Sequence, residues 1–194
     1  MQIDPGSLDR KELYALITGI VVPRPIAFVS TVGKSGVATV APFSFFNAVS
    51  SSPPVMAVSV GISRWGKKNT LLNVEETGEF VINIVNEGML KQVGICGEHQ
   101  KRDVSKIDLA KLTSLASTKV KPPRIAESPA SMECTLDRLV DIEGATTVMF
   151  GKVVQVHVND ALIAGGTIDP RKVGALGRLS GTLYCRTTDF LSLE

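Results

Sequence analysis

The chain has 194 residues, of which 44% are hydrophobic and 21% are charged, and its formal net charge is +2. This length is sufficient to bury a core, and the composition excludes an intrinsically disordered chain. The basic residues are scattered, whereas a nucleic-acid-binding surface needs a broad basic stripe, so we expect no nucleic-acid partner. We expect a single domain that spans residues 1–194.

The cysteines and the N-terminal residues further limit the classes of protein to which the chain can belong. Cys96, Cys134 and Cys185 are odd in number and their spacing fits no zinc motif, so we expect no metal site and a reducing compartment. Residues 1–14 carry acidic residues and a proline, unlike a signal peptide, and no apolar run approaches the roughly 18 residues of a membrane span. The sequence therefore predicts a cytoplasmic protein without a membrane partner, and the role of the cysteines stays open.

The first half of the chain predicts a short helix followed by strands. Asp9 and Glu12 have capping-box spacing at the start of a helix that we expect to end at Gly19. The link GKSG, which contains Gly33 and Gly36, predicts a hairpin between the first two strands. The expected strands are 25–32, 37–43, 55–61 and 79–85. The expected helices are 69–77, capped by Asn69, and 88–96.

The second half is also rich in strands. Residues 97–130 form a polar and proline-rich connection, and Asp169 followed by Pro170 predicts the start of one more short helix. The expected strands are 132–142, 146–159 with a break at Gly151, and 182–190. Many short strands with a few short helices predict a closed antiparallel barrel, whose mouth offers a concave binding site.

Several familiar motifs are absent from the sequence. The segment VGKS at 32–35 is no P-loop, because Phe28 stands where a glycine is required and a strand follows instead of a helix. No GxGxxG follows a strand, so a nicotinamide cofactor would have to bind without a Rossmann unit. His157 alternates with valines and is expected to point outward, and a catalytic pair of Cys96 with His99 lacks an orienting carboxylate. We expect no side chain to act as general acid or base.

Two segments carry the candidate site. The run APFSFFNAVSSSPP at 41–54 combines aromatic, amide and hydroxyl groups, which suit a flat heterocycle. The run RWGKKNT at 64–70 places lysines before a helix start, where unpaired N–H groups favour an anion. Taken alone, the second run is more typical of solvated lysines beside an ordinary helix cap. The two runs together predict a site for a mononucleotide cofactor.

The sequence also resembles a known family. The segments that carry the resemblance are RPIAFVSTVGKSGVATVAPFSFFNAVSSSPPVMAVSV, KKNTLLNV, EFVINIV and GRLSGTLYCRT. Together they look like the flavin reductase-like, FMN-binding split-barrel family, in particular its flavoredoxin branch. The resemblance implies a mainly β fold with short helices, a six-stranded antiparallel Greek-key split barrel. It further implies a homodimer with FMN bound near the subunit interface.

The resemblance also implies which residues contact the flavin. The loop after the second strand would wrap the isoalloxazine ring through Ser44, Phe45, Phe46 and Asn47. Other residues would lie near the flavin or its ribityl chain, namely Ser30, Thr31 and Ser50. The phosphate would be held by Lys68 and Thr70. The C-terminal motif contributes Arg178 and Tyr184. Because the phosphate site is short, we expect FMN instead of FAD.

The chain departs from the family pattern at two positions. Asn69 replaces an aspartate that often lies between the lysine and the threonine. Thr146 replaces a histidine that contacts the dihydronicotinamide in the NADH:flavin reductase branch, which argues against rapid oxidation of NADPH or NADH. We therefore expect a flavoredoxin-like protein that performs flavin-mediated electron transfer or reduction with a redox partner protein. Two alternatives stay open: an NAD(P)H-dependent reductase that supplies reduced FMN to a flavin-dependent monooxygenase, and a non-redox flavin-binding module.

Overall fold

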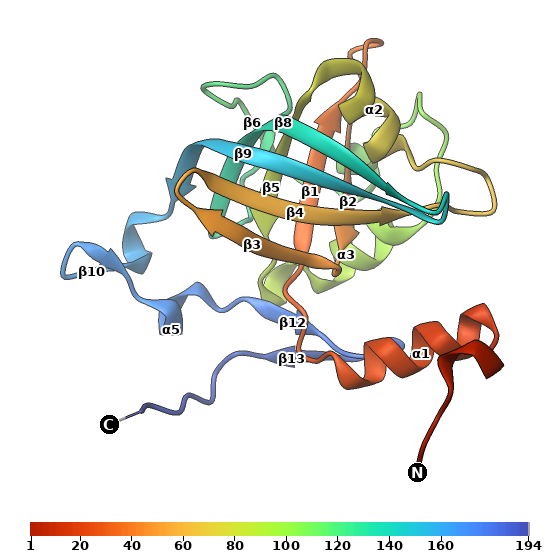
Figure 1. The fold of residues 1–194 in the computed structure, drawn as a ribbon. Helices are drawn as coiled ribbons and strands as arrows, with labels where there is room; N and C mark the ends of the chain where they lie inside the picture. Colours follow the sequence, from red (N-terminus) through yellow and green to blue (C-terminus); the bar gives the residue numbers. More distant parts are fainter. Residues whose placement is uncertain (194) are drawn as a thin grey trace.

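The computed structural model describes residues 1–193. Its main feature is a seven-stranded antiparallel sheet with the order β2-β1-β5-β8-β9-β4-β3, which curls into a barrel (Figure 1). The strands are β1 (Ala27–Val32), β2 (Ala38–Phe43), β3 (Phe46–Ser51), β4 (Pro54–Gly61), β5 (Glu79–Ile84), β8 (Ala130–Ile142) and β9 (Thr146–Val158). Because β2 lies against β4 at the opening, the two ends of the sheet approach each other.

Short helices and two-stranded ladders surround the barrel. The helices are η1 (Pro5–Ser7), α1 (Arg10–Ile20), α2 (Asn69–Thr77), η2 (Glu87–Met89), α3 (Leu90–Gly97), α4 (Lys106–Leu109), η3 (Asp160–Leu162) and α5 (Pro170–Val173). The ladders pair β6 (Ser114–Leu115) with β7 (Arg124–Ile125), β10 (Ile163–Ala164) with β11 (Thr167–Ile168), and β12 (Leu176–Arg178) with β13 (Tyr184–Arg186). No helix among residues 1–193 is long and apolar enough to cross a membrane.

The mainly β architecture is as predicted, but the strand count is seven instead of six. The difference is β3, because residues 46–51 pair with β4 instead of forming a free loop. The strand expected at 182–190 is limited to β13, which pairs only with β12. The hairpin of β1 and β2 is confirmed, and Gly36 occupies the left-handed position of its turn with φ +81°.

Two hydrophobic clusters lie on opposite faces of β1. Phe28 packs into the outer cluster with residues of α3 and α4, whereas Ala27 and Val29 pack into the barrel interior. Successive side chains of a strand point to opposite faces, so β1 has to be apolar on both. This explains why β1 is buried along almost its whole length.

Strand β9 passes through Gly151 without a break, contrary to the sequence prediction. A Cβ at this position would lie 2.2 Å from Cζ of Phe80, which is fully buried in the barrel interior. Glycine therefore serves to let β9 cross closely over the Phe80 ring, and pairing with β4 and β8 continues on both sides. The glycine is a close-packing residue and not a strand breaker.

The helix caps follow the sequence in one case and differ in another. Asp9 and Glu12 form the predicted capping box of α1. Asn69, in contrast, is the first residue of α2, and the cap position belongs to Lys68, whose backbone is still extended. The Asn69 side chain instead donates to the carbonyl of Gln100, at 2.9 Å. The change from extended to helical backbone therefore occurs one residue earlier than the sequence predicted from the Asn69 side chain.

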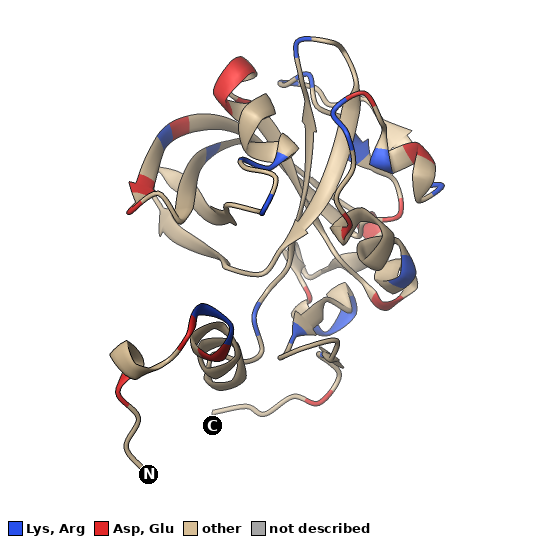
Figure 2. Ribbon diagram, turned by 90° about the vertical axis from the view of Figure 1, so that its right-hand side faces the viewer, with Lys and Arg blue, Asp and Glu red and all other residues tan. Residues whose placement is uncertain are grey.

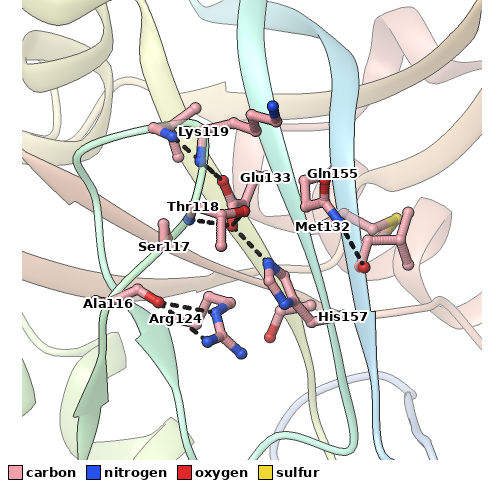
Figure 3. A network of polar contacts seen from close by, with 12 residues as sticks. Ala116, Ser117, Thr118, Lys119, Arg124, Met132, Glu133, Gln155 and His157 are labelled. Carbon is pink, nitrogen blue, oxygen red and sulfur yellow. Dashed lines mark hydrogen bonds and ion pairs between the residues drawn. The ribbon is translucent and has the colours of Figure 1, made fainter.

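His157 does not point outward, as its alternation with valines predicted. Its Nε2 lies 2.5 Å from a carboxylate oxygen of Glu133 on β8, and only 21% of its side chain is exposed (Figure 3). The neighbouring Val156 is the exposed residue. The prediction failed because the segment between β6 and β7 covers this face of the sheet, so the polar side chains lie beneath it.

Candidate functional site

A cleft of about 620 Å³ opens between the N-terminal helix and the barrel. Helix α1, the end of β2 and strand β4 all contribute to its walls. Its walls are Arg10, Lys11, Tyr14, Pro42, Phe43, Ser44, Phe45, Ser59, Gly61, Lys68, Ala145 and Thr146. Aromatic and apolar groups therefore face each other across a space that also offers hydroxyl and cationic groups, as a planar polar heterocycle requires.

A smaller cavity of about 210 Å³ adjoins the cleft. Pro42, Phe43 and Lys68 line both spaces, so the cleft and the cavity meet at these residues. The other walls of the cavity are Thr39, Ala41, Ser63, Trp65, Asn69, Thr70, Gly97, Glu98, His99, Gln100 and Lys106. The arrangement consists of a broad space for a ring system and a narrow space beside the start of α2.

Lys68 lies where the two spaces join. Its ammonium group is 5.3 Å from the centroid of the Phe43 ring, and it takes part in none of the ion pairs among residues 1–193. Much of the side chain is exposed, yet protein around the ammonium removes water from it and lowers the pKa below 10.5. Desolvation disfavours the charged form, so a bound anion would be favoured there as a counter-charge.

The start of α2 adds hydrogen-bond donors to the same place. No side chain caps this helix, and the backbone N–H groups of its first turn have no acceptor within the helix. Thr70, in that turn, is 2% exposed and lines the small cavity. Free N–H groups together with the helix dipole favour an anion at this point.

The small cavity contains two further polar groups that no sequence motif predicts. The hydroxyl of Thr39 on β2 is buried and has no hydrogen-bond partner within the described part of the chain. Lys106 is 8% exposed and donates to the carbonyl of Cys96 at 2.8 Å. Burial lowers the pKa of Lys106, and the nearby charge of Lys68 lowers it further. An unpartnered donor and two mutually repelling cations fit the phosphate group of a mononucleotide.

Six of the residues expected at the site do line these spaces or the next one. Ser44, Phe45 and Lys68 line the cleft, and Lys68 and Thr70 line the small cavity. A third space of about 520 Å³ is bounded by Ser44, Arg178 and Tyr184. There Arg178 donates to the hydroxyl of Tyr184 and to the carbonyl of Gly181, so the arginine braces the C-terminal turn.

The other five lie outside the three spaces. Ser30 is fully buried and donates to the carbonyl of Pro123 at 2.5 Å, and Thr31 accepts from the Asn73 amide at 3.0 Å. Thr31 thus connects β1 to α2 and positions the start of that helix indirectly. The remaining three residues belong to β3, where they pair with β4, and they are Phe46, Asn47 and Ser50.

Arg24 organises the helical wall of the cleft, although its sequence context gave no sign of this role. It is 4% exposed and donates to the carbonyls of Thr18, Val21 and Leu179 at 2.8–2.9 Å. It therefore binds the C-terminal end of α1, where a cation is favoured by the helix dipole. With α1 held in this way, Tyr14 stacks on Phe45 at a centroid distance of 6.2 Å.

Thr146 lines the cleft, and its relation to a nicotinamide stays a prediction. Thr146 begins β9 and lines the cleft next to Ala145. A ligand in the cleft would therefore have a threonine hydroxyl beside it.

Residues 19–175 match the family model of the flavin reductase like domain. The chain belongs to the flavin reductase-like family. This match includes Lys68, Thr70 and every strand of the seven-stranded sheet, so the barrel described above is the split barrel of that family.

Two solved structures of similar sequence support this assignment. Nitrilotriacetate monooxygenase component B from Bacillus cereus is 34% identical, with a TM-score of 0.94, over 100% of this chain and 98% of that chain. The 2-nitrobenzoate 2-nitroreductase NbaA from Pseudomonas fluorescens is 31% identical, with a TM-score of 0.92, over 100% and 95%. Flavoredoxin of Desulfovibrio vulgaris, at 19% identity and a TM-score of 0.81 over 100% and 97%, shares the fold. A flavin-related redox function follows for the family.

Proposed function

We propose that this chain is an FMN-binding flavoprotein that carries out flavin-mediated electron transfer or reduction. The observation that carries the proposal is the junction at Lys68 of a cleft with aromatic walls and a small cationic cavity. FMN consists of a planar ring system joined by a ribityl chain to one phosphate. The sizes and linings of the two spaces match these parts in that order.

The chain's own residues would orient the cofactor. Lys68, Thr70 and the first-turn N–H groups of α2 would bind the phosphate, with Thr39 and Lys106 behind them. Phe45, Tyr14 and Phe43 would contact the ring and exclude water from one side. Bound FMN would supply the redox chemistry, and the protein would supply orientation and a fixed set of hydrogen-bond donors.

The visible spectrum of the purified protein tests this proposal. We expect flavin absorption bands after reconstitution, and mass spectrometry of the ligand released on denaturation should identify FMN. A protein that binds neither FMN nor riboflavin after reconstitution would refute the proposed function. A protein that binds flavin without any redox turnover would instead be a binding module.

A second candidate is an NAD(P)H-dependent reductase that supplies reduced FMN to a partner monooxygenase. It is favoured by the similarity over the whole chain to a protein named as one component of a monooxygenase. Turnover of NADH and NADPH with free FMN distinguishes it from a flavoredoxin-like carrier, which would depend on a redox partner protein.

We also propose a homodimer. Apolar side chains at the end of α1 and at its C-cap are exposed, with Ile17 at 42%, Ile20 at 69% and the cap residue Val21 at 53%. Figure 1 and Figure 2 show α1 set apart from the barrel, beside the C-terminal segments, and the charged residues spread over loops and helices instead of covering one face. A second subunit that packs on α1 would bury these side chains and cover the adjoining cleft.

A further inference from the structure

The rings of Trp65 and His99 form a stacked pair at the small cavity. Their centroids are 4.0 Å apart and their planes differ by 12°. Trp65 lies in the connection between β4 and α2, and His99 follows α3, so the pair joins two segments that are distant in sequence. Both rings line the small cavity together with Lys68 and Thr70.

The pair lies between this cavity and the solvent. Trp65 is 55% exposed and His99 is also exposed, although each contributes to the cavity wall. Thr39 of β2 and Lys106 also line the cavity, and both are buried. The stacked rings are therefore the outer boundary of the space in which the phosphate of the ligand would lie.

The turn that carries Trp65 is ordered by its own hydrogen bonds. Ser63 and Gly66 exchange two backbone hydrogen bonds of 3.0 Å, and the Ser63 hydroxyl accepts from the backbone of Trp65 at 3.2 Å. Arg64 lies over the indole, with its guanidinium carbon 4.1 Å from the ring centroid. An aromatic ring that is held by its turn and by a stacking partner has little freedom to move aside.

We propose that the Trp65–His99 pair is a specificity element that restricts the ligand to a flavin with a terminal phosphate. This inference rests on the proposed function and identifies the feature that would separate FMN from FAD. The phosphate of FMN is a monoester that ends in the cavity, whereas that of FAD continues into a second phosphate and a nucleoside. To continue outward, FAD would have to separate the stacked rings, and such a steric obstacle is a means of discriminating against one ligand.

Affinities of the wild type and its variants for FMN, FAD and riboflavin test the proposal. We expect the wild type to bind FMN at least about tenfold more tightly than FAD, the order of magnitude that one steric obstacle provides. Trp65→Ala and, independently, His99→Ala should bring the two affinities closer together by several-fold. Lys67→Ala is the matched control, because Lys67 does not line the cavity and pairs with Glu75, and it should preserve the ratio.

The outcomes separate this inference from the proposed function. Equal wild-type affinities for FMN and FAD would overturn the inference while the flavoprotein assignment stands. An unchanged ratio in both folded variants, checked by circular dichroism, would also overturn it. Failure of the wild type to bind any flavin would refute the proposed function itself. Riboflavin, which has no phosphate, should bind wild type and variants alike.

Discussion

The imidazole of His157 lies 2.5 Å from the carboxylate of Glu133, a side chain with no exposed surface (Figure 3). The same carboxylate accepts hydrogen bonds from the backbone of Thr118, Lys119 and Val120. Glu133 therefore holds the segment between β6 and β7 against the sheet. Burial alone would raise its pKa, but these hydrogen bonds outweigh burial and lower the pKa from 4.5 to about 2.

Replacing Glu133 with Gln should destabilise the protein in a pH-dependent manner. An amide has one acceptor oxygen instead of two, and each buried donor left unpaired costs about 1–3 kcal/mol. Because the folded-state pKa is depressed, the contribution of Glu133 is complete above pH 4.5 and is lost as the pH falls towards about 2. Urea unfolding at several pH values should show a difference between wild type and variant that shrinks in this window. A constant difference would contradict the linkage.

Replacing Lys68 with Ala should weaken FMN binding more than riboflavin binding. A hydrogen bond to a charged group contributes about 1.5–3 kcal/mol, which corresponds to a roughly ten- to hundredfold loss. Riboflavin affinity should change by less than about threefold on the same scale. Lys67→Ala is the matched control, because Lys67 already pairs with Glu75. Fluorescence titration measures both ligands, and equal losses for both would show that Lys68 supports the fold instead of the phosphate.

Reduction of the bound flavin by NADH should be slow in the wild type and faster in Thr146→His. Thr146 lines the cleft, so the longer side chain of a histidine there would carry a ring N–H donor further towards the ligand than the threonine hydroxyl reaches. One added hydrogen bond of about 1 kcal/mol corresponds to about a fivefold rate increase. Stopped-flow bleaching of the flavin measures the rate. Rapid bleaching of the wild type, at hundreds per second, would refute the expectation.

Replacing Gly151 with Ala should destabilise the barrel. The added methyl group would lie 2.2 Å from the buried Phe80 ring and 3.1 Å from Cβ of Cys134. Overpacking of a core costs about 1–3 kcal/mol. Gly94→Ala in α3 meets nothing within 4 Å and should instead stabilise, by up to about 1 kcal/mol. Urea midpoints of the two variants should shift in opposite directions.

The homodimer is tested by light scattering at micromolar concentration. We expect a dimer for the wild type and a shift to monomer for Ile20→Glu, because Ile20 is 69% exposed and contributes little to the folded monomer. Leu115→Glu, at a position that is 40% exposed on β6, is the control and should remain dimeric. A monomeric wild type with FMN bound would contradict the proposal.

Local patterns predicted every strand of the sheet except β3, since alternation and turn residues act over short distances. The capping box of α1 and the turn of Gly36 were found for this reason. What the sequence could not indicate depends on contacts between distant segments. Gly151 leaves room for the Phe80 ring, and Glu133 accepts hydrogen bonds from the backbone of the segment between β6 and β7.

In the candidate site, too, the residues of a local motif were predictable and those brought together by folding were not. Lys68 and Thr70 stand in one short motif, and both line the small cavity. Thr39 lies within an ordinary strand and Lys106 within a polar stretch, and only folding places them at the same cavity. Ser30 and Thr31 were expected near the flavin, but the Ser30 hydroxyl donates to the carbonyl of Pro123 and the Thr31 hydroxyl accepts from the Asn73 amide. The binding roles of the expected residues stay predictions.

The bond from Arg24 to the carbonyl of Leu179 has a consequence for biosynthesis. Helix α1 is synthesised before the barrel strands, yet one of its anchors is supplied by Leu179, which follows all of them. During translation the barrel strands can pair before Leu179 has left the ribosome. Until then, α1 lacks the hydrogen bond from Arg24 to Leu179 that helps to hold it beside the cleft. The cofactor would therefore meet a finished cleft only after Leu179 has been synthesised, so ribosome-bound fragments that end before β12 should not retain flavin.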